Sequence, residues 1–104
     1  MIGMASELRR QKRLHLDLPL HVALLDEVKG IPSESEGTLY DLSAGGCAFF
    51  HSMEIPIGSR VQLKITLNES LSKRFRKQEL TARGAICRIQ RHGSEYLLSV
   101  RFFK

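Results

Sequence analysis

Hydrophobic residues alternate strictly with other residues near the start of the chain. Leucine or valine occupies every even position from 14 to 24, whereas His15, Asp17 and His21 fall between them. Successive side chains of a strand point to opposite faces, so this period of two predicts a half-buried β-strand over residues 14–25. Pro19 has no N–H for a sheet ladder, which predicts an edge position or a bulge within this strand.

The same period returns several times along the chain. A second amphipathic strand is expected over residues 61–67, and further strands over 38–41, 47–50, 80–89 and 96–102. A polar loop over 30–37 and turns at 42–46, 56–59 and 92–94 separate them. After Ile86 the alternation of apolar and polar residues shifts by one position, which predicts a bulge. The basic stretch 68–78 breaks the alternation and predicts a loop or a short helix capped by Asn68.

About six strands without a long helix close best into a barrel, because closure removes exposed sheet edges. The sequence therefore predicts an all-β fold, a six-stranded antiparallel β-barrel with little helix. Its 104 residues suffice for one domain with one core. Residues 1–12 are predicted to be a flexible N-terminal arm, and residues 13–104 the barrel domain.

The chain is basic, with a net charge of +5, and this favours anionic partners such as nucleotides, nucleic acids or lipid head groups. Basic residues cluster at 9–13 and 73–77; Phe75 within the second cluster is expected to anchor its loop to the barrel. Two cysteines without a CxxC motif, Cys47 and Cys87, predict small buried or half-buried side chains in a reducing compartment. No segment resembles a signal peptide or a membrane span, so we expect a cytoplasmic protein.

The motifs of common catalytic sites are missing from the sequence. The four histidines show no i, i+4 spacing and none lies beside a cysteine pair, and GxSxG, Walker-type and GxGxxG motifs do not occur. We therefore predict that the protein is not an enzyme and has no catalytic residues, no metal site and no cofactor.

Two short motifs occur in an informative order. Arg9 and Arg13 form an RxxxR pattern directly before the first expected strand. The segment from Asp41 to Gly46, Asp-Leu-Ser-Ala-Gly-Gly, fits DxSxxG and lies between two later strands. Together they resemble the PilZ domain family, the cyclic di-GMP receptors of bacteria. The likeness runs from Leu8 to Phe103 and includes a GxVxR-like strand at 84–88 and a closing Arg-Phe at 101–102, with Ser99 where glycine is usual.

The resemblance implies a binding site for the second messenger cyclic di-GMP. Arg9 and Arg13 are expected to contact phosphates and guanines, because a guanidinium forks two donors onto either group, with Arg10 as a further phosphate contact. Asp41 is expected to accept from guanine N–H groups, and Ser43 to bond base or phosphate. Gly46 is expected to allow close approach of the ligand and an unusual φ. Leu8, where some relatives carry arginine, implies a single ligand molecule.

The implied function is signal transduction without catalysis. Ligand binding would order the arm and change contacts with a downstream protein partner. The family barrel is often followed by a helix over one end, and the chain stops after its last expected strand, so self-association as a homo-oligomer is a further expectation. Two alternatives stay open: a PilZ-like interaction domain that binds no ligand, and a small nucleic-acid-binding barrel. The second is less favoured because most aromatic residues occupy core-parity positions.

Overall fold

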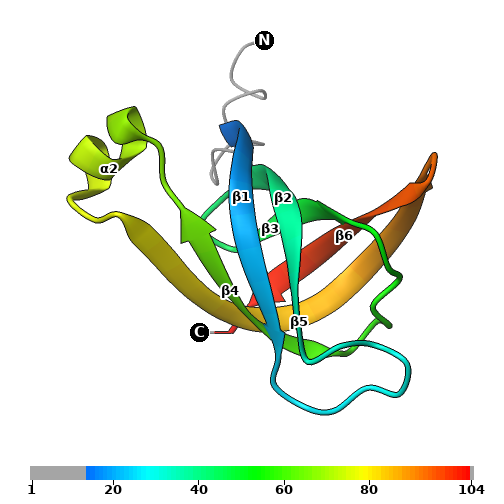
Figure 1. Ribbon diagram of the computed structural model, residues 1–104. Helices are drawn as coiled ribbons and strands as arrows, with labels where there is room; N and C mark the ends of the chain where they lie inside the picture. The colour runs from blue at the N-terminus through cyan, green and yellow to red at the C-terminus, as the bar shows by residue number, and fades with distance from the viewer. Residues whose placement is uncertain (1–13, 104) are drawn as a thin grey trace, which may run out of the picture.

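The computed structural model describes residues 14–103, which form a closed barrel of six antiparallel strands (Figure 1). The strands follow the order β1-β2-β3-β6-β5-β4 around the barrel. Their bounds are β1 Leu14–Leu24, β2 Glu34–Leu42, β3 Gly46–His51, β4 Arg60–Thr66, β5 Glu79–His92 and β6 Glu95–Phe102, with the short helix α2 Glu69–Phe75 between β4 and β5. The predicted fold class is therefore confirmed.

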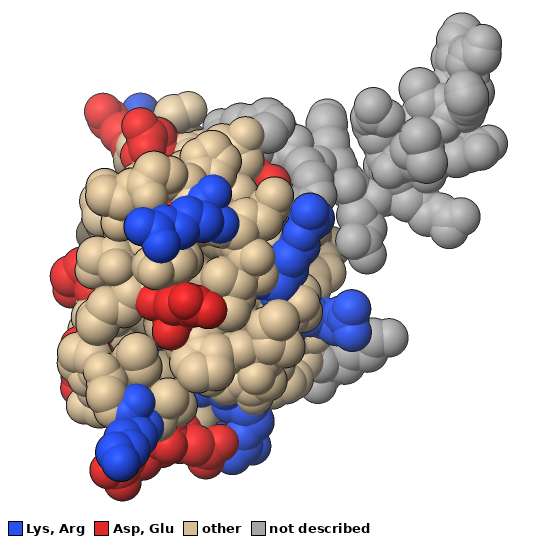
Figure 2. Space-filling model, turned by 90° about the vertical axis from the view of Figure 1, so that its right-hand side faces the viewer, with Lys and Arg blue, Asp and Glu red and all other residues tan. Residues whose placement is uncertain are grey.

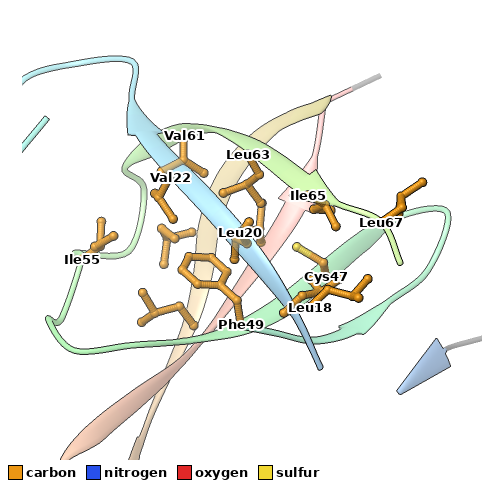
Figure 3. Close-up of a cluster of buried hydrophobic side chains, with 14 residues drawn as sticks. Leu18, Leu20, Val22, Cys47, Phe49, Ile55, Val61, Leu63, Ile65 and Leu67 are labelled. Atoms are coloured by element: carbon orange, nitrogen blue, oxygen red, sulfur yellow. The ribbon is translucent and has the colours of Figure 1, made fainter. Parts of the chain in front are cut away.

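The barrel interior holds the side chains that the period-two pattern predicted. Leu18, Leu20 and Val22 of β1 are buried, as are Val61, Leu63 and Ile65 of β4. Phe49 of β3 lies among them with no exposed surface (Figure 3). Burying apolar surface on this scale is the dominant stabilising contribution to such a fold.

Irregular strand pairing was predicted at two places, at Pro19 in β1 and after Ile86 in β5. The bulge in β5 is confirmed, since the register with β6 shifts between Ile86 and Arg88. In β1 the register with β2 shifts between His15 and Leu18, before Pro19, and Pro19 itself pairs with Thr38. The prediction of an edge position or a bulge agrees with this, because the shift lies just before Pro19 and β4 offers Pro19 no partner. The proline is tolerated because the pairing of β1 with β4 begins only at the next residue, Leu20.

Strand β2 begins earlier than predicted, because residues 34–37 belong to it rather than to a polar loop. The polar side chains there face outward or bond neighbouring strands. Both ring nitrogens of His21 lie near carboxylates, Nε2 at 3.0 Å from Glu34 and Nδ1 at 3.2 Å from Glu36. The Ser35 hydroxyl lies 2.8 Å from Nε2 of His51. These cross-strand contacts stabilise residues 34–37 as part of β2, although their polar composition predicts a loop.

Strand β3 runs between two unlike ends of the barrel, the His51 end and the motif end, where Gly46 follows the turn of residues 43–45. At the His51 end, Ile55 has no exposed surface and His51 is 1% exposed. The Met53 N–H donates to Nδ1 of His51 over 3.0 Å. The ring is thus bonded on both sides, which satisfies a polar group that burial would otherwise penalise.

The segment between β4 and β5 forms the short helix that was one of two predicted outcomes. Asn68 caps α2 by accepting from the Leu71 N–H at 2.9 Å. Phe75 was expected to anchor a loop to the barrel; it lies instead at the end of α2, with 40% of its surface exposed. Tyr40 and Phe103 are also exposed, whereas Phe49 is buried and Tyr96 and Phe102 pack against the core.

The cysteines differ from each other. Both are free thiols; Cys47 is buried in the barrel, as predicted, whereas Cys87 is exposed. Cys87 occupies the bulge of β5, and an extra residue in one strand need not follow the in-and-out alternation of its neighbours. The expectation of two buried or half-buried cysteines is therefore wrong for Cys87.

Candidate ligand-binding site

The turn between β2 and β3 carries the Ser-x-x-Gly part of the DxSxxG motif. Both the backbone N–H and the hydroxyl of Ser43 donate to the carbonyl of Gly46, over 2.9 and 3.2 Å. The Phe102 N–H of β6 donates to the Gly45 carbonyl at 2.9 Å. The turn is therefore tied to itself and to the last strand, and it presents a fixed backbone rather than an open loop.

Asp41 lies near the end of β2, two residues before Ser43. It pairs with His15 of β1 and Ala48 of β3, and its register with β3 shifts after Leu39. Asp41 is 8% exposed and Ser43 is 7% exposed. Both side chains are therefore largely shielded from solvent, where a hydrogen bond to a ligand is stronger than it is in water.

Gly46 is required by the fold for a reason that the sequence did not reveal. A Cβ on Gly46 would meet the Val100 carbonyl oxygen of β6 closer than real Cβ atoms come, and one on Gly84 of β5 would meet the Arg101 carbonyl in the same way. Two glycines therefore let β3 and β5 approach β6 from its two sides. The φ of Gly46 is not positive, so the structure does not use the unusual φ that a glycine permits.

A shallow hollow of about 590 Å³ lies beside the turn. Its wall is formed by residues 43–47, by residues 99–103 at the end of β6 and just after it, and by Cys87 from the β5 bulge. Ser43 and Gly46 line it, whereas Asp41 does not. Arg101 lines it too, and the described residues offer no ion pair to its guanidinium.

Arg101, Ser99 and Cys87 were not predicted as site residues. The sequence held a signal for Arg101, since the parity of the last strand places it outward, opposite the buried Val100. No pattern in the sequence indicated Cys87, which lines the hollow because it lies in the bulge of β5.

The structure tests only part of the predicted site. It brings Asp41, Ser43 and Gly46 to one end of the β2–β3 hairpin. Arg9, Arg10 and Arg13 lie outside the described residues. The residue directly after Arg13, Leu14, pairs with Leu42, and His15 pairs with Asp41. The chain therefore enters the barrel alongside the residues that begin the DxSxxG motif.

Other kinds of site find little support in residues 14–103. No group of three or more His, Cys, Asp or Glu side chains there could hold a metal ion. No helix in the same range is long and apolar enough to cross a membrane. On the face seen in Figure 2, basic and acidic side chains are interspersed over a largely uncharged surface, and they do not form a continuous basic track of the kind that nucleic-acid backbones require.

Comparison with protein families shows to which family the chain belongs. The family model that describes the PilZ domain matches residues 7–104. The chain belongs to the PilZ domain family. The match begins before Arg9, so it includes both motifs of this PilZ domain. PilZ domains are receptor or adaptor domains of cyclic di-GMP signalling rather than enzymes. Among curated proteins, none matches the chain.

Solved structures share the fold of this PilZ domain at low sequence identity. The inhibitor of motility MotI (DgrA) of Bacillus subtilis aligns with a TM-score of 0.69 and 17% identity over 92% of this chain, which spans only 42% of MotI. The PilZ domain of Escherichia coli YcgR, solved with cyclic di-GMP, aligns at 0.65 and 20% over 92% of this chain and 78% of that one. The PilZ domain of CeSA from a cellulose-synthesizing bacterium aligns at 0.58 and 21%, over 88% and 81%.

Proposed function

We propose that this PilZ domain binds cyclic di-GMP at the motif end of the barrel and changes its protein contacts in response. The observation that carries the proposal is the pairing of Leu14 with Leu42 and of His15 with Asp41. Arg13 is one peptide bond from Leu14, and consecutive Cα atoms are about 3.8 Å apart. The RxxxR motif therefore joins the barrel where the DxSxxG motif lies, although the two are far apart in sequence.

The residue types suit the two guanines and two phosphates of this ligand. Arg9 and Arg13 would fork donors onto phosphate oxygens or onto guanine O6 and N7, and Arg10 would add a phosphate contact. The Asp41 carboxylate would accept from guanine N–H groups, which an arginine cannot do. The Ser43 hydroxyl already donates to Gly46, so it would serve the ligand as an acceptor, or as a donor after rotation.

The hollow beside the turn provides room for part of the ligand. Its volume of about 590 Å³ lies within the range of roughly 300–1,000 Å³ typical of small-molecule sites. Arg101, which pairs with Gly46 next to the turn, would add a cation. Gly46 would act indirectly, because its missing Cβ lets the turn and β6 lie close enough to form the hollow.

The proposed output is a change in the segment that carries the arginines. Residues 1–12 would form the arm and residues 13–104 the barrel domain, in a cytoplasmic protein. Ligand held between arm and barrel would favour one arrangement of the arm, and a downstream protein would respond to that arrangement. The free energy available for this shift is limited to the difference in ligand affinity between the two arrangements.

Isothermal titration calorimetry with cyclic di-GMP tests the proposal and gives the stoichiometry, for which we expect one ligand molecule. A charge-assisted hydrogen bond contributes roughly 1.5–3 kcal/mol, so Arg13→Ala or Asp41→Asn should weaken binding about tenfold to a hundredfold. Arg91→Ala, an exposed arginine near the far tip of the β5–β6 hairpin, is the matched control and should bind as the parent does. A folded parent protein that gives no heat and no thermal stabilisation with cyclic di-GMP would refute ligand binding and favour the interaction-domain alternative.

A further inference from the structure

A second hollow lies at the motif end, on the other side of the β2–β3 turn. It has a volume of about 350 Å³, and most of its wall is apolar: Leu42, Ile65, Phe75, Leu80, Ala82 and Phe102. Leu42, Leu80 and Phe102 are only partly buried although they pack against the core. The barrel therefore offers apolar surface here that its own described residues do not cover.

Helix α2 fixes one wall of this hollow. Leu71 and Phe75 are four residues apart and so share a helix face, and Leu71 packs against the core. Asn68 caps the start of the helix, and the Arg76 N–H donates to the Ser72 carbonyl at its end. Phe75 is thus held at the rim with 40% of its surface exposed, on a capped helix rather than on a loop.

The rim next to Phe75 is basic. Lys73, Arg74, Arg76 and Lys77 are all exposed, whereas Glu69 and Glu79 are the acidic residues of this segment. Lys73 lies 3.9 Å from Glu69, and within residues 14–103 the other three cations form no ion pair. Arg76 adopts a left-handed conformation with φ of 58°, which costs a non-glycine residue roughly 1 kcal/mol or more. Glycine is the usual residue at such a cap, whereas this chain has a cation there.

We propose that this surface, the α2 hollow, docks an acidic amphipathic helix of a partner protein. Apolar side chains of that helix would enter the hollow against Phe75, and its carboxylates would meet the cations of residues 73–77. An amphipathic helix placing spaced apolar anchors into a groove is a common recognition mode, and charge complementarity selects the partner and its orientation. A single exposed aromatic beside a hollow does not provide the row of stacking faces that single-stranded nucleic acid requires.

The turn connects this surface to the proposed ligand site. Ser43 and Ala44 line both hollows, one on each side of the same turn. A ligand that displaces or stiffens the turn would change the shape of the α2 hollow, and docking would change ligand affinity by the same factor. This coupling rests on the proposed function, whereas the docking surface does not.

The test uses a designed 16-residue helical peptide, with leucine and phenylalanine along one face and glutamate along the other. Its twin carries lysine in place of every glutamate. Fluorescence anisotropy with the full chain should show at least tenfold tighter binding of the glutamate peptide, and amide shifts should map to residues 42–44, 75 and 80–82. Phe75→Ala should weaken binding at least tenfold. Ile57→Ala, which removes a 63% exposed apolar side chain elsewhere, should leave it unchanged.

Charge reversal examines the basic rim separately from the apolar wall. Arg74→Glu with Lys77→Glu should exchange the preference of the two peptides, whereas Lys29→Glu, at an exposed position on another loop, should not. Equal binding of both peptides, or binding that survives Phe75→Ala, overturns the proposal. So does a Phe75-dependent self-association, or Phe75-dependent binding to anionic vesicles without peptide binding, because each assigns the surface another occupant.

Addition of saturating cyclic di-GMP distinguishes the two proposals. A change of threefold or more in peptide affinity supports the coupling, and no change overturns it. Loss of peptide binding with ligand binding intact rejects the α2 hollow alone. Peptide binding without any ligand binding rejects the proposed function and the coupling, and it leaves the docking surface supported.

Discussion

The two ends of the barrel handle polar and apolar groups in opposite ways. At the His51 end, the buried polar ring is bonded within the chain, and Ile55 is fully covered. At the motif end, apolar side chains at the barrel opening stay partly exposed, and two hollows flank the turn of residues 43–45. Figure 3 shows Ile55 at one end of the buried cluster and Leu67 toward the other.

The difference indicates where stability and where binding are concentrated. Satisfied polar groups and complete burial stabilise a single arrangement, so the His51 end should resist local opening. Exposed apolar surface contributes less to stability, but it is what a partner can contact. Helix α2 belongs to the second kind of region, since none of its residues is fully buried and it stands beside the barrel wall (Figure 1).

The largest effect that we predict concerns Gly46, where β3 packs closely against β6. Gly46→Ala would press a methyl group against the Val100 carbonyl, and rotation of a side chain cannot relieve a clash between backbones. We expect a loss of more than about 3 kcal/mol in the free energy of unfolding, measured by urea denaturation.

Gly58→Ala is the matched control for this substitution. Gly58 has open space around its Cβ position but a φ of 94°, so it measures backbone strain alone, roughly 1 kcal/mol. If Gly46→Ala costs no more than Gly58→Ala, the close approach of β3 to β6 does not shape the site.

Gly46 also shows what sequence reasoning reaches and where it stops. The motif singled out this position, but the reason why the fold needs glycine there depends on which strand lies opposite. The strand opposite Gly46 is β6, which lies more than fifty residues further along the chain, and no local sequence pattern predicts this pairing. The barrel itself was predictable because period two is local and closure follows from it. The extended β2 was not, because residues 34–37 gain their strand from cross-strand contacts with His21 and His51.

A smaller effect is predicted at the His51 end. His51→Ala would leave the Met53 N–H and the Ser35 hydroxyl without their partner and open a cavity beside Phe49, whose ring lies 6.0 Å from the imidazole. We expect a loss of about 2 kcal/mol in the free energy of unfolding, with cyclic di-GMP affinity unchanged. His92→Ala removes an exposed ring that contacts only the edge or face of Phe50 among the described rings, and should cost less than about 1 kcal/mol. Equal losses for the two variants would contradict the contrast between a bonded and an exposed ring.

The smallest effect that we predict concerns a surface ion pair just after the end of β1. Arg60 donates from Nε and Nη2 to the two carboxylate oxygens of Asp26, each over 2.8 Å. The hydrogen bonds from Arg60 are the main reason that the pKa of Asp26 falls below its ordinary value of 3.8. Both side chains are more than half exposed, so solvent screens the pair and its contribution to stability is small.

The direction of that shift sets the pH at which the pair matters. A carboxyl group with a lowered pKa in the folded state stabilises the fold above its unfolded pKa, and the contribution is lost as the pH falls through the folded value. Parent and Asp26→Asn should therefore differ by a small constant amount in thermal midpoint above about pH 5, and converge as the pH falls below about 4. A difference that grows toward low pH would contradict the assignment. Cyclic di-GMP affinity should be the same in both proteins at neutral pH, because Asp26 follows the end of β1 that lies away from the motif turn.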